Sequence, residues 1–469
     1  MTESRINTEE KFSLKTAFKF GTGQLSDVAS YQSFVFWIFT FYYTVVQLRA
    51  SIITIAFVIW AVWNAFNDPL LGYFSDRTHT KRGRRIPWIM VSIIPLSVLM
   101  FLMYSPPKVF GIEGSSANFI YFFITIIVFE FFYTMFSLNQ TSLFPEQFID
   151  KDIRGKVNNV KQLYSVFGLI IAALLPSLFI TDPTMPEYLE SWPIYGIVLA
   201  IFTFLFAFIF IKWGAKEKAE FREDYKETPG FFESIKLCVK SKSFRWYIPA
   251  EIANWFVYGM LPTIIPLYGR CVLGIEKESI LLSVLLGIGF ISAAIFINFW
   301  RWVASKIGPR KAWMASLTTW IITLSPLLFV DTFELALITF FFVGIGLAGS
   351  MVLIDLIVAD IIDEDEVNTG IRRDASYYGV NALFLRFSTV FVFLAISLVF
   401  TSVGWDVFIP EGADLSKFVV GLRILIFVFP AIAMIIAILS LYKYPLDGER
   451  LREVKEKLAK IHEEKKLKV

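Results

Sequence analysis

Histidine, cysteine and charge are all scarce in this chain of 469 residues. Its two histidines, His79 and His462, fall in charged segments, which excludes a histidine proton relay or a metalloprotease-type motif inside an apolar run. Its two cysteines, Cys238 and Cys271, fall in different segments and form no disulfide framework. Charged residues make up 18% of the chain, against about 25% in an ordinary soluble domain. The polar start up to Lys19 contains no short apolar core with a cleavage site, so no cleavable signal peptide is expected.

Apolar residues are abundant: they make up 56% of the chain, and the mean hydropathy is +0.61. Apolar runs of about 18 residues or more recur along the chain, long enough to cross a hydrocarbon core of about 30 Å as helices. Alternation of apolar and polar residues is absent, and the runs are too long for barrel strands of about 10 residues. The chain is therefore predicted to be an all-α membrane protein in contact with the lipid bilayer.

Twelve membrane-spanning helices are predicted. Their centres lie near residues 33, 63, 95, 130, 171, 202, 257, 291, 321, 348, 389 and 430. If both termini are cytoplasmic, 37 of the 44 Lys and Arg residues fall on the cytoplasmic side and 5 on the other side. Such a bias follows the positive-inside rule and supports the count of twelve with both termini cytoplasmic.

A long charged connection divides the spans into six and six. The predicted parts are an N-terminal six-helix bundle (1–213), a middle loop (214–243), a C-terminal six-helix bundle (244–443) and a cytoplasmic tail (444–469). After Pro229 the loop has apolar residues at helical spacing, which indicates a surface helix or a plain linker. The tail mixes charges of both signs, as an exposed helix or a frayed end without site chemistry would. The arrangement resembles the major facilitator superfamily, which implies a substrate site between the halves.

Two segments, each running from one predicted span into the next, carry a narrower resemblance. The first holds Asn67-Asp68-Pro69, Gly72, DRTHTKRG and Pro87-Trp88, and the second is ADIIDEDEVNTGIRRDASYYG, residues 359–379. Together with Phe20-Gly21 ahead of Asp27, these motifs resemble the glycoside-pentoside-hexuronide cation symporters. That resemblance covers most of the chain and implies cation-coupled transport of a sugar.

Seven charged residues fall inside predicted spans: Asp27, Asp68, Glu130, Glu251, Asp355, Asp360 and Arg386. A charged side chain at the bilayer centre costs roughly 2.5 to 3.5 kcal/mol even on the lenient insertion scale, so each suggests a functional site with a partner.

The predicted cation-coupling residues are Asn64, Asp68, Thr134 and Arg386. In the resembled permeases, two aspartates at i and i+4 bind sodium or a proton beside a threonine. This chain has Asn64 at the first position and Asp68 at the second, with Thr134 matching the threonine. Arg386 stands where a lysine is usual, and Asp68 or Asp27 is its expected partner. A lone buried carboxylate favours a proton, sodium at Asp68 is the one metal option, and a purely structural Asp68–Arg386 clamp is the alternative.

The substrate site is predicted around helix 4, where Glu130, Thr134, Ser137 and Thr141 form one stripe at helical spacing. The resemblance implies that Asp27 and Lys161 occupy sugar-contacting positions, while Ser137 and Thr141 replace a sugar-binding aspartate and a tryptophan. Glu130, two turns outward, is a candidate replacement for the missing acid. Further candidates, for which helix packing is the alternative, are Tyr133, Asn139, Gln140, Asn254, Trp255 and Tyr258.

The two cytoplasmic motifs carry complementary charges, which predicts a gate between the halves. Its candidate residues are Asp76, Arg77, Arg84 and Arg85 on one side and Asp363, Asp365, Glu366, Arg372 and Arg373 on the other. Asp363-Glu364-Asp365 also fits a DxD metal motif, but the chain has no sugar-nucleotide domain to go with it.

The sequence therefore predicts a secondary symporter for a sugar or glycoside, coupled to a proton in preference to sodium. A lysolipid or other amphipath is the alternative substrate, and a transporter-like sensor or a membrane enzyme is a weaker alternative. No cofactor besides the transported ion, no nucleic-acid partner and no enzymatic activity are expected. The expected form is a monomer in the cell membrane.

Overall fold

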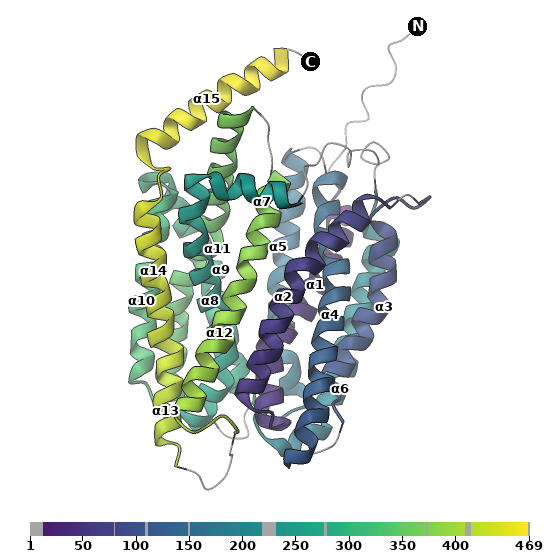
Figure 1. Cartoon of the computed structure of the whole chain (residues 1–469), viewed down its shortest axis with the longest axis vertical. Coiled ribbons are helices and arrows are strands. Elements are labelled where there is room, and N and C mark those ends of the chain that lie inside the picture. Colours follow the sequence, from purple (N-terminus) through teal and green to yellow (C-terminus); the bar gives the residue numbers. More distant parts are fainter. Residues whose placement is uncertain are drawn as a thin grey trace.

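The computed structural model describes residues 13–78, 80–107, 111–148, 151–217, 231–275, 279–370, 374–408 and 414–467. These residues form helices and short connections, with a single isolated β-bridge between Thr80 and Gly83. Figure 1 shows the purple-to-blue helices of the first half beside the green-to-yellow helices of the second. The chain is therefore all-α, as predicted.

The first half contains six long helices. They are α1 (Leu14–Thr40), α2 (Ala50–Asp76), α3 (Ile86–Met103), α4 (Gly111–Gln147), α5 (Lys151–Leu174) and α6 (Trp192–Ile209). Single turns of other helix types are η1 (Phe41–Val45), η2 (Leu175–Leu178), η3 (Pro186–Glu190) and η4 (Phe210–Gly214).

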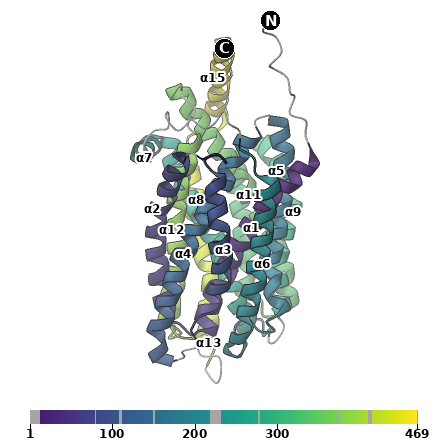
Figure 2. The same cartoon turned by 90° about the vertical axis from the view of Figure 1, so that its right-hand side faces the viewer.

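The remainder begins with α7 (Phe231–Lys240), which is followed by the helices of the second half. These are α8 (Lys242–Cys271), α9 (Ser279–Ile307), α10 (Pro309–Leu324), η7 (Ser325–Leu328), α11 (Phe333–Thr369), α12 (Asp374–Ser402), α13 (Ser416–Arg423), η8 (Ile424–Val428), α14 (Phe429–Lys443) and α15 (Gly448–Leu467). Figure 2 shows α7 and α15 projecting at the same end of the bundle, the end at which α1 begins (Figure 1).

Each of the twelve predicted span centres lies inside one of these helices. Within the described ranges, nine segments are long and apolar enough to cross a membrane. Helices α1, α8 and α10 are not among the nine; α10 has 16 residues, and α1 and α8 are less apolar than most. Membrane crossing by all twelve helices and a cytoplasmic location of both termini therefore stay predictions.

The two halves are held together at the end opposite α7 and α15. Ser51 donates its backbone N–H and its hydroxyl to the carboxylate of Asp406, each over 2.9 Å. Arg270 donates to Asp182 and to Thr184, each over 2.7 Å. Along the sides, α2 packs against α12 and α5 packs against α9. This end is therefore closed by polar bonds between the halves.

Small residues let helices of one half approach closely, as is common in membrane proteins. A Cβ atom at Gly344 of α11 would lie 2.5 Å from the Gly289 carbonyl oxygen on α9 and 2.5 Å from Cβ of Ser292. The α9–α11 contact thus requires glycine at residue 344. By contrast, a Cβ atom at Gly287 of α9 would meet no atom within 4 Å.

We expect Gly344→Ala to lower the free energy of unfolding by about 1–3 kcal/mol, because overpacking forces the two helix backbones apart. Gly287→Ala is the matched control and should be neutral or stabilising, since alanine favours a helix. Thermal unfolding of the two purified variants in detergent checks this. Equal melting temperatures would contradict the close α9–α11 contact.

Candidate functional site

Acidic and basic side chains of both halves meet inside the bundle. Thr134 of α4 donates its hydroxyl to Oδ1 of Asp68 on α2, over 2.9 Å. Arg386 of α12 donates through Nη2 to Oδ2 of the same carboxylate, over 2.8 Å. The same nitrogen lies 3.4 Å from Oε1 of Glu130 on α4. We call Asp68, Glu130, Thr134 and Arg386 the central charge cluster; it joins α2 and α4 of one half to α12 of the other.

Burial differs among the members of this cluster. Glu130 is fully buried, whereas the side chains of Asp68 and Arg386 are 22% and 20% exposed. Oε2 of Glu130 has no hydrogen-bond partner among the described residues. With both carboxylates ionised, the cluster would carry one net negative charge in a place where an unpaired charge is costly.

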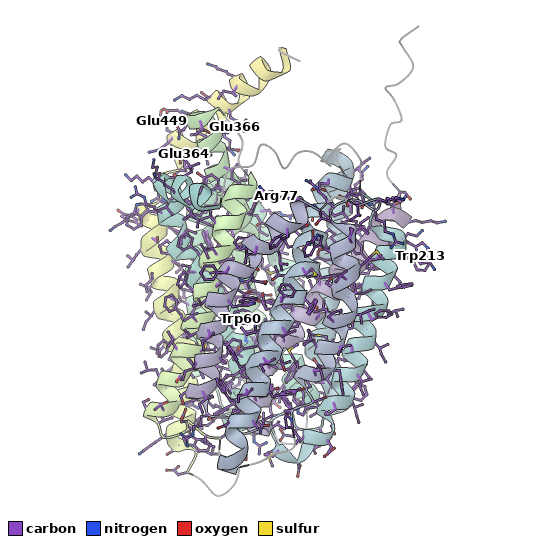
Figure 3. All side chains as sticks on the ribbon, turned by 45° about the vertical axis from the view of Figure 1, so that its right-hand side comes forward. Trp60, Arg77, Trp213, Glu364, Glu366 and Glu449 are labelled. Atoms are coloured by element: carbon purple, nitrogen blue, oxygen red, sulfur yellow. The ribbon has the colours of Figure 1, made fainter. Side chains whose placement is uncertain are left out.

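Aromatic rings surround the arginine. The guanidinium of Arg386 stands over Trp60 of α2, 5.6 Å from the ring centroid, and Figure 3 shows Trp60 near the middle of the bundle. Tyr31 of α1 stacks on Tyr133 of α4 with centroids 4.6 Å apart. The sequence interpretation missed Trp60 and Tyr31. Trp60 could have been found, because it stands two helical turns before Asp68 and so shares its helix face.

Asn64 lies outside this network. Its side chain is buried, and neither its amide nitrogen nor its oxygen has a hydrogen-bond partner in the described part of the chain. The second carboxylate near Asp68 comes instead from Glu130 on α4, which the sequence interpretation assigned to substrate. Helical spacing places residues 64 and 68 on one face, but only packing shows which neighbouring helix supplies the other groups.

A cavity of about 590 Å³ lies beside the cluster, between α1, α2, α4, α8 and α12. Five predicted substrate residues line it: Tyr133, Ser137, Thr141, Trp255 and Tyr258. Asp68, Thr134 and Arg386 line it as well. Residues that line it without having been predicted include Tyr31, Gln32, Tyr378, Ser388 and Thr389. The cavity thus combines aromatic faces with hydrogen-bonding groups and touches the charge cluster.

The other predicted substrate residues are not among those that line this cavity. Asp27 is buried beside Ser137 and Tyr133, within electrostatic range of Lys161. Lys161 stands over the ring of Phe144, 4.3 Å from its centroid. Gln140 and Asn254 are buried, and one polar side-chain atom of each lacks a partner among the described residues. Asp27 therefore reaches the cavity through Ser137 and Tyr133, whose side chains line it.

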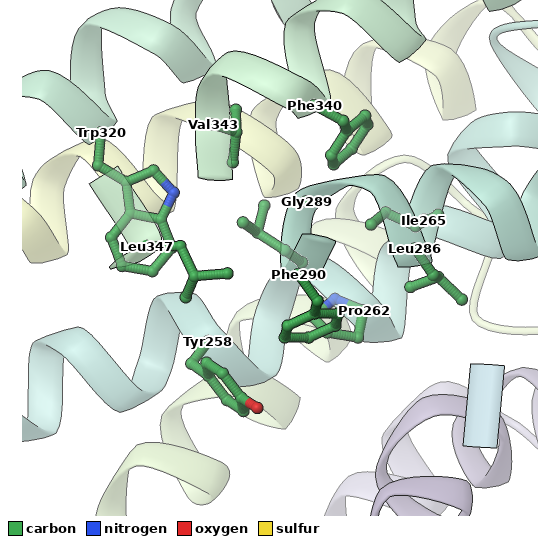
Figure 4. A pocket seen from close by; sticks show the side chains of 11 residues that line it. Tyr258, Pro262, Ile265, Leu286, Gly289, Phe290, Trp320, Phe340, Val343 and Leu347 are labelled. Atoms are coloured by element: carbon green, nitrogen blue, oxygen red, sulfur yellow. The ribbon is translucent and has the colours of Figure 1, made fainter. Parts of the chain in front are cut away.

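Two further hollows differ in character. One of about 850 Å³ lies between α5, α9 and α11, and its polar lining residues include Gln162, Asn298, Arg301 and Asp355. The other measures about 40 Å³ and lies within the second half; Figure 4 shows Phe290, Phe340 and Leu347 around it. The small pocket is almost entirely apolar and offers a substrate little to bind with.

The predicted gate residues of the first half bind within that half. Arg84 and Arg85 each lie 2.8 Å from Oε1 of Glu146 at the end of α4. Their backbone N–H groups donate to Glu217, which follows α6, over 2.7 and 3.1 Å. Arg77 lies toward this end of the bundle (Figure 3). The side chain of Asp76 and residues Arg372 and Arg373 lie outside the described residues, so their part in a gate stays a prediction.

Acidic residues at the end of α11 pair with the tail helix α15. Lys455 lies 2.6 Å from Asp360 and 2.7 Å from Asp363, and Arg450 lies 2.7 Å from Glu364. Figure 3 shows Glu364 and Glu366 at this end, close to Glu449 of α15. From its mixed charges, the tail was predicted to have no site chemistry. This contact could not be foreseen from the sequence, because α15 folds back onto a helix about ninety residues earlier.

Burial by itself would lower the pKa of Lys455, but its bonds to the carboxylates of Asp360 and Asp363 outweigh burial and raise that pKa above the ordinary value. Lys455 is therefore charged at neutral pH. Its contribution to tail docking should be lost only as the pH rises through this raised pKa.

Residues 19–448 match the family described as MFS/sugar transport protein. The chain belongs to this family. That match confirms the resemblance to the glycoside-pentoside-hexuronide symporters and the major facilitator fold.

Relatives agree along most of their length. The chain is 20% identical to an uncharacterized symporter of Synechocystis sp., over 87% of this chain and 89% of the relative. It is 23% identical to the sodium-dependent lysophosphatidylcholine symporter 1 of Mus musculus, over 89% and 82% of the two chains. It is also 23% identical to the isoprimeverose transporter of Lactiplantibacillus pentosus, over 78% and 75%.

Solved structures show the same fold. The nucleoside transporter NupG superposes with a TM-score of 0.66 at 13% identity, over 92% of this chain and 100% of that one. A D-xylose-proton symporter gives 0.60 at 13% identity, over 93% and 97%. The protein is accordingly a multi-pass membrane transporter and not an enzyme.

We expect Lys455→Ala to loosen α15 from α11. A half-exposed ion pair contributes roughly 0.2–1 kcal/mol, so amide exchange in α15 should become about 1.4- to fivefold faster. Lys457→Ala is the matched control, because Lys457 is exposed and its substitution removes the same positive charge. Hydrogen exchange followed by mass spectrometry measures both. Equal rates in the two variants would contradict a docking role for Lys455.

Proposed function

We propose that this transporter is a symporter that moves a sugar or glycoside together with a cation, a proton in preference to sodium, by alternating access. The observation that carries the proposal is the central charge cluster on the wall of the 590 Å³ cavity. It brings an ionisable pair, a substrate-sized space and a contact between the halves to one place.

The net charge of the cluster favours uptake of one cation, and its few free oxygen atoms favour a proton. Two carboxylates, Asp68 and Glu130, share the single guanidinium of Arg386. One added positive charge therefore neutralises the cluster. Sodium needs several free hard oxygens, yet Oδ1 of Asp68 already accepts from Thr134 and Oδ2 accepts from Arg386. A proton needs only one carboxylate oxygen, and Oε2 of Glu130 has no partner in the described part of the chain.

Protonation also alters the contact between the halves. Arg386 belongs to the second half and both carboxylates to the first. When a proton neutralises either carboxylate of this pair, the interaction of that carboxyl group with Arg386 loses its charge-assisted character. The halves are then freer to rock about the bound substrate. The closed end with Ser51–Asp406 and Arg270–Asp182 is the outer gate in this scheme, and the cytoplasmic motifs form the inner one.

The cavity suits a sugar. Its volume of about 590 Å³ falls in the range of about 300–1,000 Å³ for small-molecule sites. Rings of Tyr133, Trp255 and Tyr258 offer faces for stacking, while Gln32, Ser137 and Thr141 offer hydrogen bonds to hydroxyl groups. A relative named as an isoprimeverose transporter agrees with a glycoside substrate.

We place the protein in the cell membrane as a monomer with both termini cytoplasmic.

A lysolipid or similar amphipath is the second candidate substrate. The 850 Å³ hollow between α5, α9 and α11 has an apolar lining that includes Leu163, Ile297 and Leu356, together with charged Arg301 and Asp355. An acyl chain and a charged head group would match such a lining. Several relatives are named as sodium-dependent lysophosphatidylcholine symporters.

Uptake into proteoliposomes tests coupling and substrate together. Labelled sugars, glycosides and lysolipids are offered under an imposed pH or sodium gradient, and we expect pH-driven accumulation of a sugar or glycoside. Asp68→Asn should abolish accumulation while exchange down a concentration gradient persists. Asp414→Asn makes the same change at an exposed residue and should leave accumulation unaltered. Undiminished accumulation in Asp68→Asn would refute the coupling role.

Substrate recognition is tested separately through Asp27→Asn with the sugar found in that panel. Asp27 holds Ser137 and Tyr133, which line the cavity. Replacing its charged hydrogen bonds to them costs about 1.5–3 kcal/mol, so affinity should fall by about 10- to 100-fold. Binding by isothermal calorimetry measures the effect. Asp331→Asn, a change in the connection before α11, is the control, and equal affinities in the two variants would remove Asp27 from the site.

A further inference from the structure

A second buried acid lies in the other half of the molecule. Glu251 of α8 is 2% exposed, and Asn381 of α12 donates its amide to Oε1 of Glu251 over 2.9 Å. Tyr247 and Trp255 lie one helical turn to either side of Glu251, close enough to act on its carboxyl group. Glu251 is separate from the central charge cluster, and the coupling scheme above makes no use of it.

In the part of the chain that the structure describes, this acid lacks a basic partner. Within the described ranges, no Lys or Arg lies within ion-pair distance of Glu251, and the charged group that acts on it is the like-charged Asp355 of α11. The other groups facing it are neutral: Tyr247 and Trp255 on its own helix and Asn381 on α12. Asp68 differs, since Arg386 pairs with it directly. An ionised Glu251 would thus be a buried charge without compensation, which is strongly unfavourable.

The hydrogen-bond donors and acceptors around Glu251 also favour its protonated form. Oε2 of Glu251, the hydroxyl of Tyr247 and Oδ1 of Asn381 are all buried, and none has a partner among the described residues. An ionised carboxylate only accepts hydrogen bonds. It would leave the hydroxyl of Tyr247 and the indole N–H of Trp255 as the remaining donors near Oε2 and Oδ1. A proton on Oε2 adds a further donor, so that Oε2, Oδ1 and the hydroxyl of Tyr247 can be satisfied by one another.

Two neighbours of this acid each line a hollow. Asp355 acts on Glu251 and is itself exposed to the 850 Å³ hollow between α5, α9 and α11, which Arg301 of α9 lines as well. On the other side of Glu251, Trp255 lines the 590 Å³ cavity. Glu251 is therefore placed between the two largest hollows described above.

We propose that Glu251 is a second proton-binding site, which exchanges its proton with the larger hollow through Asp355. The proton moves between the carboxyl oxygen of Glu251 and a carboxylate oxygen of Asp355, which returns it to water, so no other reactant is needed. This site would let the second half sense the proton independently of Asp68. Only its role in transport rests on the proposed symport; the protonation itself does not.

Infrared difference spectroscopy of the full-length protein in proteoliposomes tests the site, with protons as the probe. A protonated buried carboxyl group gives a carbonyl stretching band that shifts in heavy water. We expect such a band at neutral pH in the unaltered protein, and its loss in Glu251→Gln, which keeps the acceptor for Asn381. The band should persist in Asp68→Asn. Thus a failure of the coupling scheme leaves this result untouched.

Tyr247→Phe provides a second measurement. It also tests the proposal if the Glu251→Gln variant does not fold. Removing the hydroxyl takes one hydrogen bond from the carboxyl group, so the same band should shift in frequency without disappearing. In Asp355→Asn the band should remain, but its exchange with heavy water should slow severalfold. A band that is unchanged in Glu251→Gln, or in Tyr247→Phe should the first variant not fold, would overturn the proposal.

Discussion

Arg386 is the charge on which the arrangement of this transporter depends. Its guanidinium carries a permanent positive charge in a helix of otherwise apolar character, and such a charge must be paired inside a membrane protein. The structure pairs it with Asp68 and sets it beside Glu130 and over Trp60. Because the partners lie in the other half, the need to neutralise one side chain also ties the halves together near the cavity.

The buried acidic side chains of the two halves have different surroundings. In the first half, Asp68 and Glu130 share a counter-charge that arrives from across the junction. In the second half, Glu251 is surrounded by neutral hydrogen-bonding groups and one like-charged neighbour. A carboxyl group next to an arginine is stabilised as an anion, whereas one among neutral groups is stabilised with its proton. The molecule thus contains two kinds of ionisable centre, one in each half.

Other charged residues lie at the two ends of the bundle. At one end, Ser51 with Asp406 and Arg270 with Asp182 bond the halves to each other. At the other end, Arg84 and Arg85 bind Glu146 within the first half, while Asp363 and Glu364 bind the tail helix. The tail therefore occupies some of the acids that were predicted to form a gate. A cross-gate pairing of Asp363 would have to compete with Lys455.

By itself, the sequence determined the all-α character, the places of the helices and the family, because apolar length, the bias of basic residues and local motifs are readable along the chain. It also singled out Asp68, Thr134 and Arg386, since a polar residue in an apolar run is conspicuous. Only the tertiary structure decided that Glu130 supplies the second carboxylate of the central charge cluster, that Trp60 covers Arg386, and that α15 reaches Asp363. Each of these contacts joins helices far apart in sequence, and helical spacing gives the face of a helix but not the neighbour that packs against it.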